Sequence, residues 1–229
     1  MQNCVPYPVA ARELLRTSLL DAACDQLNER RWANVTMADI ALAAGVSRQT
    51  LYKQFGSREE FARALVTRET DRLLSAVEKA VNAHREDLVS VLVDAFDVLV
   101  RAPADNALVR AIVTWQGAEE LLALLTAGRD MSLVELITEH LAQLVLAGWP
   151  RLDPRVAKTL SECLVRLAVG YTVLPSGGFS MGHAPVAALL GPYVKRLIED
   201  HTAPALIESS PSSTTSACRS PRRGRFTGR

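Results

Sequence analysis

Apolar residues recur at intervals of three and four along most of the chain, which is the spacing of one face of an α-helix. The first such segment runs from Val9 to Arg31. Its apolar positions are Leu14, Leu15, Leu19, Ala22, Ala23 and Leu27. Strict alternation of apolar and polar residues between turn residues, which is typical of β-hairpins, does not occur. The sequence therefore predicts an all-α protein.

Two short helices are predicted next. Thr36 is followed three residues later by Asp39, so this pair can form a capping box at the start of the first one. Gly45 can adopt the left-handed conformation that ends that helix. Ser47 is a suitable N-cap for the second short helix, Arg48 to Phe55. Helix, tight glycine turn and helix is the plan of the helix-turn-helix.

The remaining pattern is also helical. Gly56 ends the second short helix, and the run from Ser57 to Glu60 is a capping box that opens a long helix toward Asn82. Asp153 and Pro154 read as an N-cap followed by proline at the first helical position. Further helices are predicted over 86–101, 104–125 with a break at 117, 131–147, 154–173 and 185–201.

Charge is concentrated locally. The chain has 26 Lys and Arg against 25 Asp and Glu, so its net charge of +1 does not by itself indicate a nucleic-acid partner. From Ile40 through Arg58, however, there is no acidic residue, while Arg48, Lys53 and Arg58 are basic. The predicted helix-turn-helix is therefore positively charged.

Several classes of site are not expected. The four cysteines lie far apart and form no C-x-x-C pair, and the histidines are widely spaced, so we predict neither a disulfide framework nor a metal site. We find no glycine-rich phosphate loop and no nucleophile elbow, and predict no cofactor, no catalytic residue and no enzyme. The start of the chain lacks the pattern of a secretory signal, and no stretch is apolar enough to span a membrane. We expect a cytoplasmic protein.

The segment TMADIALAAGVSRQTLYKQFGSREEF, from Thr36 to Phe61, resembles the DNA-binding signature of the tetracycline-repressor (TetR) family. The matched features are T-x-x-x-I-A, the A-G-V-S turn, T-L-Y-x-x-F and the S-x-E-E helix start. The resemblance covers roughly Val9 to Leu65; beyond that, only size and helical content are similar. One departure is Gln54, where many members have His or Tyr, and it affects only the detail of that DNA contact.

The resemblance implies that the chain has two functional domains. Residues 1–56 would form the helix-turn-helix DNA-binding domain, and residues 57–203 a helical domain that binds a ligand and dimerises. The last two long helices would pair with those of a second copy in a four-helix bundle. Family members are mostly repressors released by a small molecule. We therefore expect a homodimer that binds a palindromic operator in double-stranded DNA and responds to a small apolar effector.

Eight residues are candidates for DNA contact. They are Thr36, Met37, Ser47, Arg48, Gln49, Thr50, Tyr52 and Lys53. Arg48 can pair with guanine and Gln49 with adenine, whereas Thr50 can touch a phosphate or a thymine methyl group. Tyr52 and Lys53 are interpreted as phosphate contacts, and the helix start at 36–37 offers backbone N–H groups to another phosphate. Each residue alone could be ordinary surface or core; together, on one exposed helix face, they favour DNA binding.

The effector and dimer sites are less sharply indicated. Candidate pocket residues are Trp115, Gln116, Glu119, Glu120, His140, Tyr171 and Phe179, with ordinary core and surface as the alternative for each. Candidate dimer residues on one helix are Val156, Leu160, Leu164, Leu167 and Val169, with the small residues Ala157, Ala168 and Gly170 among them. The alternative for this helix is a purely internal core position.

The last segment, 204–229, differs in composition. From Glu208 onward it is rich in Ser, Thr, Pro, Gly and Arg, and it contains five arginines and one acidic residue. We expect a disordered basic tail that adds DNA affinity without sequence preference, or that simply improves solubility. Two other classes of protein stay open: an enzyme on a helical bundle, and a protein-interaction module with a degenerate DNA-binding head. Salt-dependent binding of upstream DNA in a gel shift would favour the regulator.

Overall fold

The computed structural model describes residues 7–84, 87–113, 121, 123, 132–173 and 183–202, and within these ranges the chain is helical and contains no strand. The all-α prediction is therefore confirmed. The elements are α1 (Tyr7–Glu29), the 3₁₀-helix η1 (Trp32–Asn34), α2 (Met37–Ala43), α3 (Arg48–Phe55), α4 (Arg58–Ala83), α5 (Leu88–Asp105), α6 (Ala107–Val113), α8 (Leu133–Gly148), α9 (Pro154–Val173) and α10 (His183–Thr202).

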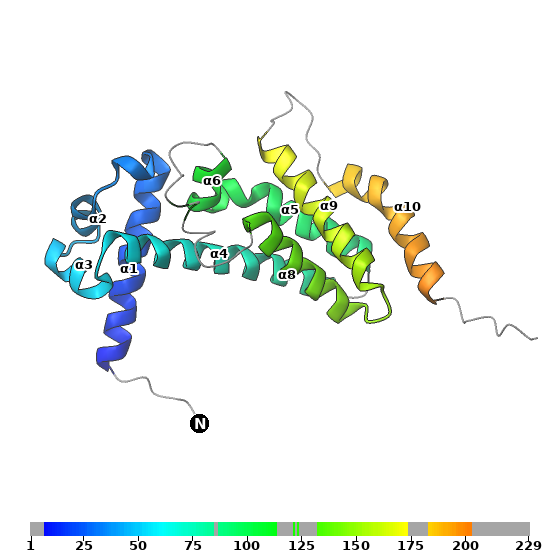
Figure 1. The fold of residues 1–229 in the computed structure, drawn as a ribbon, viewed down its shortest axis with the longest axis horizontal. Coiled ribbons are helices and arrows are strands. Elements are labelled where there is room, and N and C mark those ends of the chain that lie inside the picture. The colour runs from blue at the N-terminus through cyan, green and yellow to red at the C-terminus, as the bar shows by residue number, and fades with distance from the viewer. Residues whose placement is uncertain are drawn as a thin grey trace, which may run out of the picture.

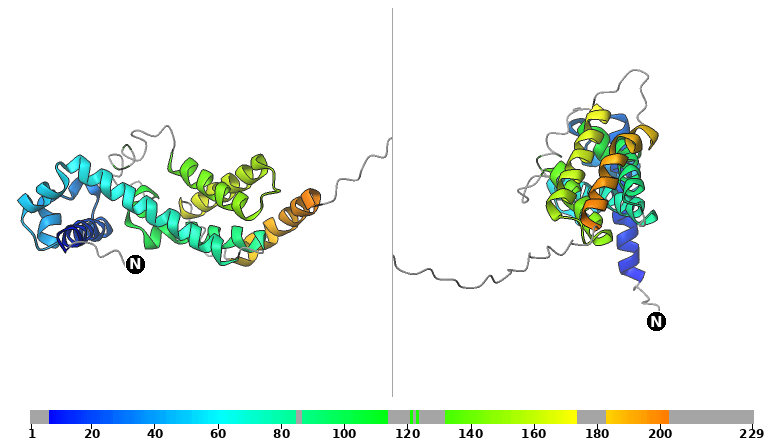
Figure 2. Two further views of the ribbon diagram at one scale, coloured as in Figure 1. Left: turned by 90° about the horizontal axis from the view of Figure 1, so that it is seen from below. Right: turned by 90° about the vertical axis from the view of Figure 1, so that its right-hand side faces the viewer.

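The molecule is elongated. Helices α1 to α3 form a head at one end, and α8, α9 and α10 lie toward the other end (Figure 1). The long helix α4 runs from the head into the body, as Figure 2 shows from below. Among the described helices, none combines the length and the apolar character needed to cross a membrane.

The head has its own hydrophobic core. It is built from Leu19 of α1, Ile40 of α2 and Leu51 of α3, which are completely buried. The first half of α4 adds Phe61 and other buried residues to the same cluster, and α6 adds Ala107 and Leu108. The boundary predicted at residue 56 thus falls at the start of a helix whose first half belongs to the core of the head.

The body has a second core centred on α5. Leu88, Leu92 and Phe96 of α5 are at most 1% exposed and pack with the second half of α4 and with α8, α9 and α10. Helices α8 and α9 are joined by a short turn and lie against each other. Because α4 contributes to both cores, it is the mechanical link between the head and the body.

Most predicted helix starts are confirmed, with small differences at the ends. The helix expected from residue 86 begins at Leu88, where the Asp87 side chain accepts hydrogen bonds from two backbone N–H groups. Leu14, counted with the apolar face of the first helix, is 72% exposed, because the start of α1 projects beyond the head. Apart from Leu121 and Ala123, the predicted helical segment from 114 to 125 lies outside the described residues, as does the tail 204–229.

Candidate nucleic-acid interface and apolar cavity

The start of α2 is held by a capping box. The Asp39 N–H donates to Thr36 Oγ1 at 3.2 Å, and the Thr36 N–H donates to Asp39 Oδ2 at 3.0 Å. The Thr36 hydroxyl also donates to Asp39 Oδ2, at 2.7 Å. These bonds stabilise the carboxylate and lower the pKa of Asp39 below its usual value. The Thr36 N–H, which we expected to be free for a phosphate, is instead used inside the capping box.

The turn between α2 and α3 depends on one glycine. Gly45 has a φ of 70°, which is in the left-handed region that favours glycine. The Val46 N–H then donates to the Ala41 carbonyl at 2.9 Å, which brings the chain back across the end of α2. At the start of α3, Ser47 Oγ accepts from the Thr50 N–H at 3.1 Å and lies 2.8 Å from Thr50 Oγ1. The direction in which α3 leaves the turn is therefore fixed.

Helix α3 has one buried face and one exposed face. Leu51 and Phe55 point into the head, and the Phe55 ring meets Phe61 of α4 edge to face, with centroids 4.6 Å apart. Arg48, Gln49 and Lys53 are exposed on the other side of the helix. The exposed face carries three of the α3 side chains that we predicted to contact DNA, while Thr50 and Tyr52 are half-buried and the buried face holds the helix in place.

Arg48 and Tyr52 lie together, one turn apart on α3. Arg48 Nη2 donates to Tyr52 Oη at 3.4 Å, and the guanidinium carbon is 5.3 Å from the centre of the Tyr52 ring. Tyr52 is half-buried and packs against the core of the head. Tyr52 therefore positions Arg48. The phosphate contact of Tyr52 stays a prediction.

Met37 and Arg58, which the sequence analysis assigned to the DNA-binding segment, have side chains that stabilise the fold. Met37 is only 4% exposed, so its side chain belongs to the core and only its backbone can face a ligand. Arg58 donates to the carbonyls of Val35 and Trp32 at 2.5 and 3.0 Å, and its guanidinium carbon lies 4.6 Å from the Trp32 ring centre. Its charge joins the start of α4 to η1. Composition alone did not reveal this role, because the partners are backbone carbonyls.

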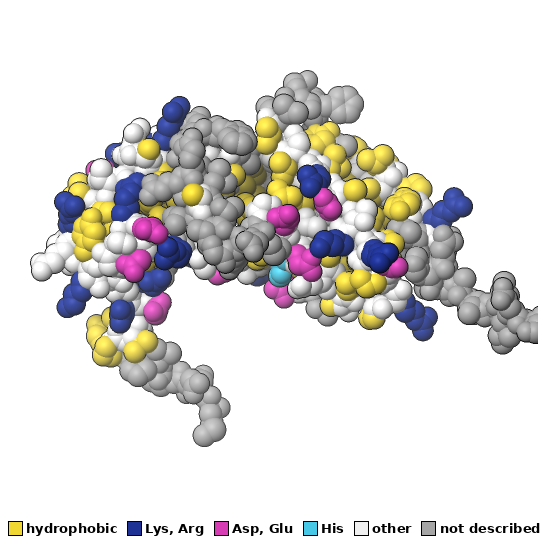
Figure 3. Space-filling view, viewed as in Figure 1, with side chains coloured by type: hydrophobic (Ala, Val, Ile, Leu, Met, Phe, Trp, Pro, Cys, Tyr) yellow, Lys and Arg dark blue, Asp and Glu magenta, His cyan; other side chains and the backbone are white. Residues whose placement is uncertain are grey.

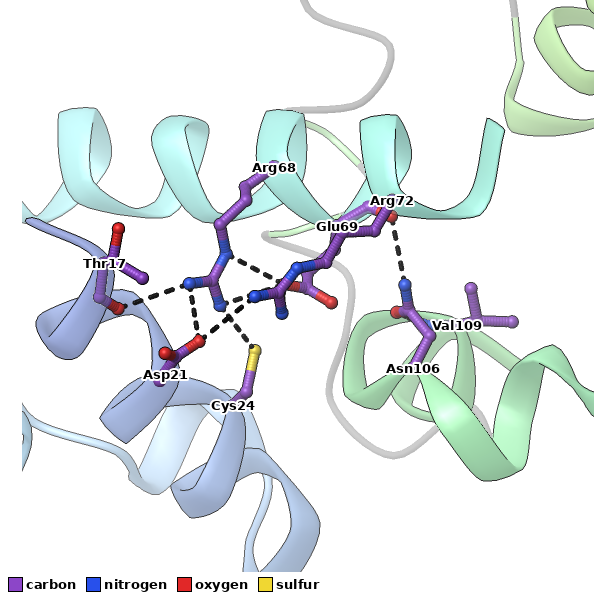
Figure 4. Close-up of polar contacts among 8 residues, drawn as sticks. All are labelled: Thr17, Asp21, Cys24, Arg68, Glu69, Arg72, Asn106 and Val109. Carbon is purple, nitrogen blue, oxygen red and sulfur yellow. Dashed lines mark hydrogen bonds and ion pairs between the residues drawn. The ribbon is translucent and has the colours of Figure 1, made fainter. Parts of the chain in front are cut away.

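A polar cluster joins α1 to α4 (Figure 4). Arg68 of α4 donates to Asp21 of α1 at 2.8 Å, and both Arg68 and Arg72 bond to the buried carboxylate of Glu69. Arg68 also donates to Cys24 Sγ at 3.3 Å. Burial, followed by the Glu69 carboxylate, raises the pKa of Cys24 to about 12. This cluster, which sequence reasoning did not find, fixes the orientation of α1 on α4.

An apolar cavity of about 240 Å³ lies in the body, between α4, α5, α6, α8 and α9. Its lining is aliphatic apart from the hydroxyl groups of Ser132 and Thr172, and contains no charged side chain. The lining residues are Leu73, Leu99, Ala102, Val109, Ile112, Ser132, Leu133, Val134, Ile137, Val165, Ala168, Val169, Thr172 and Val173. Sequence reasoning missed these residues because an aliphatic cavity wall has the same pattern as a core.

The predicted pocket residues do not line this cavity where they can be placed. Tyr171 packs edge to face on Phe96 in the core of the body, with centroids 6.1 Å apart. His140 is half-buried on α8, and its Nε2 atom is buried without a hydrogen-bond partner among the described residues. The other five, Trp115, Gln116, Glu119, Glu120 and Phe179, lie outside the described residues. Their role stays a prediction.

Apolar side chains are exposed on the last two helices. Val169 and Val173 of α9 are each 39% exposed, and Leu189 and Tyr193 of α10 are 60% and 56% exposed. Other residues of α9 that we predicted at a dimer interface are instead buried in the core of the same protomer; these are Ala157, Leu160, Leu164 and Ala168. They face α5 and α8, so only the exposed side of α9 is available to a second copy. Figure 3 shows apolar surface over this end of the molecule.

Comparison with known proteins agrees with this architecture. The family model "Bacterial regulatory proteins, tetR family" matches residues 19–65, and "Bacterial Tetracyclin repressor, C-terminal domain" matches residues 87–192. The HTH-type transcriptional regulator AlkX of Mycobacterium tuberculosis is 32% identical over 192 residues, 84% of this chain and 90% of that protein. An uncharacterised HTH-type transcriptional regulator of the same species is 30% identical over 190 residues, 80% of this chain and 86% of that one.

A solved structure is also similar. It is the TetR family repressor AlkX from a Dietzia strain, a protein implicated in the biodegradation of n-alkanes. It is 27% identical, with a TM-score of 0.56, and the match covers 79% of this chain and 97% of that one. The helix-turn-helix head, the helical body and these relatives lead to one conclusion. The chain belongs to the TetR family and is a DNA-binding transcriptional regulator.

Proposed function

We propose that the protein is a repressor that binds a palindromic operator as a homodimer and is released from it by a small apolar compound. The observation that carries the proposal is the exposed face of α3, where Arg48, Gln49 and Lys53 stand free of the core on a helix fixed at both ends. A helix of this kind, in a helix-turn-helix, enters the major groove of DNA.

The DNA contacts follow from the chemistry of that face. Arg48 pairs with the O6 and N7 atoms of a guanine, and Gln49 with an adenine, because these side chains match the edges of those bases. Lys53 and Tyr52 contact phosphates, as does the backbone at the start of α2. Arg48 leaves Tyr52 when it reaches the base, so Tyr52 holds Arg48 in place before binding and is freed for a phosphate afterwards.

The dimer is proposed from the exposed apolar residues of α10. A short recognition helix reads only a few base pairs, and two-fold symmetry doubles the number read. Leu189 and Tyr193 are large, apolar and more than half exposed, which supports an interface at this face. The change Leu189→Glu should shift the protein from dimer to monomer in sedimentation, and an unchanged dimer would exclude this face.

The effector is proposed from the cavity. Its lining offers two hydroxyl groups and no charge, so it suits an uncharged aliphatic molecule and disfavours an ion, which would lose its hydration without a partner. The likeness to a repressor implicated in n-alkane biodegradation supports an effector of this class.

DNA recognition is tested with Arg48→Ala. After selection of an operator from random duplexes, this change should cost about 1–3 kcal/mol of binding free energy and relax preference at one position of each half-site. Tyr52→Ala should weaken all sequences alike. The control is Arg101→Ala, which removes an exposed arginine of α5 that pairs with Asp97. If Arg48→Ala behaves like the control, the proposed docking of α3 is wrong.

Effector response is tested with matched alkyl compounds. 1-Decanol should weaken operator binding, whereas decyltrimethylammonium at the same concentration should not, because the cavity has no group to pair with its charge. Ala168→Phe fills the cavity and should abolish the response to 1-decanol. A response that survives this change would place the effector elsewhere.

A further inference from the structure

The end of α3 is covered by an arginine from outside the helix-turn-helix. Arg16 belongs to α1, and its guanidinium carbon lies 4.6 Å from the centre of the Phe55 ring, where a cation is attracted to the face of the ring. Phe55 is 7% exposed and packs edge to face on Phe61 of α4. The planar head of Arg16 is therefore held against the last residue of α3.

The charge of Arg16 is not neutralised within the part of the chain that the structure describes. Its side chain is half-buried, yet its guanidinium makes no ion pair and no hydrogen bond to a described residue. The neighbouring arginines of α4 are paired instead: Arg63 with Glu59 at 2.8 Å, and Arg68 with Asp21 at 2.8 Å. A guanidinium has five N–H donors, so those of Arg16 are left for solvent or for an anionic partner.

The groove beside Arg16 does not suit a small free anion. It lies between α1 and α4, has a volume of about 520 Å³, and carries acidic as well as basic side chains. The charged residues that line it are Glu13, Arg16, Glu60, Arg63, Arg68 and Asp71. A free anion would meet carboxylates there. A phosphate of a duplex that α3 already binds is different, because the other contacts with the duplex hold that phosphate in place.

The dimensions of α3 bring its ends close to the DNA backbone. The helix has eight residues, so it is about 12 Å long, which is close to the width of the major groove, also about 12 Å. When its exposed face lies in the groove, its two ends therefore approach the sugar-phosphate strands on either side. Lys53 is exposed in the last turn of α3, and Arg16 adds a second cation at this end, where α1 passes α3 in the head (Figure 1).

We propose that Arg16 binds a phosphate of the DNA backbone beside the end of α3, and that Phe55 holds the guanidinium in place before DNA is bound. A side chain that is already positioned loses less conformational freedom on binding than a mobile one. A phosphate contact carries no sequence information, so Arg16 fixes the position of α3 in the groove and reads no base. The inference rests on the proposed docking of α3 for the location of this phosphate.

The first test is the salt dependence of operator binding by Arg16→Met. Methionine can still pack on the Phe55 ring, but it brings no charge. Each lost phosphate contact lowers the slope of log affinity against log salt concentration by about 0.9, so a dimer should lose about 1.8. Arg16→Lys keeps the charge and should retain most of the wild-type slope. The control, Arg101→Met, makes the same change at an exposed arginine of α5 and should leave the slope unchanged.

The second test locates the phosphate. In a series of operator duplexes, one phosphate at a time is replaced by an uncharged methylphosphonate, and the affinity of each duplex is measured for wild type and for Arg16→Met. At one position of each half-site, the replacement should weaken wild type several-fold and leave Arg16→Met unaffected, because the variant has already lost that contact. At the other positions the two proteins should respond alike. Such non-additivity identifies groups that contact each other.

The proposal is overturned if the salt slope of Arg16→Met equals that of wild type, or if both proteins respond alike to methylphosphonate at every position. A purely structural role of Arg16 would lower the Tm of the variant and leave its salt slope unchanged. Should Arg16→Met fail to fold, Arg16→Gln, which also lacks the charge, replaces it in both tests. Failure of the proposed docking of α3 would be seen separately, as an Arg48→Ala protein that keeps the wild-type base preference.

Discussion

The carboxylate of Glu69 should make a measurable contribution to the stability of the fold. Its side chain is 3% exposed, and its Oε1 atom lies within 3.0 Å of nitrogen atoms of both Arg68 and Arg72. We predict that Glu69→Ala lowers the free energy of unfolding, because it removes the acceptor that both guanidinium groups share and leaves a small void between α1 and α4.

The loss of unfolding free energy depends on the ion pairs that Arg68 and Arg72 keep after Glu69 is removed. Breaking a buried ion pair typically costs about 3–5 kcal/mol when it leaves an unpaired buried charge. Here both arginines keep Asp21, at 2.8 and 3.3 Å. Arg72 and Asp21 are also about half exposed, so water screens their part. We therefore expect about 2 kcal/mol for Glu69→Ala. In a chain of this length that corresponds to a fall of roughly 4–8 °C in Tm.

The measurement is urea unfolding followed by circular dichroism, at one protein concentration, because dimerisation would make stability depend on concentration. The matched control is Glu139→Ala, which removes an exposed pair with Lys158 from the middle of α8. That change should cost no more than about 0.5 kcal/mol. If both variants lose the same small amount, the Glu69 carboxylate does not hold α1 on α4 and the reasoning is wrong.

Three further predictions concern single residues. Cys24, whose pKa is raised to about 12, should react with iodoacetamide far more slowly at neutral pH than the exposed Cys163, as peptide mass spectrometry can show; equal rates would contradict the burial of Cys24. The lowered pKa of Asp39 means that its capping bonds stabilise the fold above pH 3.8 and are lost as pH falls through the lowered value, so the difference in unfolding free energy between wild type and Asp39→Asn should vanish in acid. If wild type and Asp39→Asn still differ in unfolding free energy in acid, the charge of the Asp39 carboxylate does not account for its effect on stability. Gly45→Ala should cost about 1–2 kcal/mol in the same unfolding assay, because alanine disfavours a positive φ even where its Cβ has space; no loss would indicate that the turn can rearrange.

The head could be predicted closely from the sequence because its signals are local. Thr36 and Asp39, Ser47, and Gly45 act within a few residues of themselves, and the structure confirms each of these caps and turns. The role of Arg58, and the bond from Arg110 of α6 to Asn28 of α1, could not be predicted in this way. The partners of these arginines are backbone carbonyls or residues as many as 82 positions away, and no spacing in the sequence reveals such pairs.

The apolar cavity could not be predicted from the sequence, for a different reason. A helix that lines an empty space and a helix that fills a core present the same aliphatic residues at the same intervals, so periodicity cannot distinguish them. The sequence predicts a pocket marked by seven aromatic and polar residues, and the two of them that the structure describes, His140 and Tyr171, do not line the cavity. The cavity is instead formed where five helices fail to meet completely, which is a property of their packing and not of any one segment.

The sharing of α4 between the two cores has a consequence for protein engineering. A fragment of residues 1–56 would carry the whole helix-turn-helix but would lack Phe61, Leu65 and Leu108, which are buried in the same cluster. The exposed hydrophobic surface left by their removal would favour aggregation over folding. The DNA-binding head of this regulator therefore cannot be transferred to another ligand-binding domain by joining the two chains at residue 56. A chimera should be joined within the second half of α4 and should keep the start of α6, which supplies Leu108.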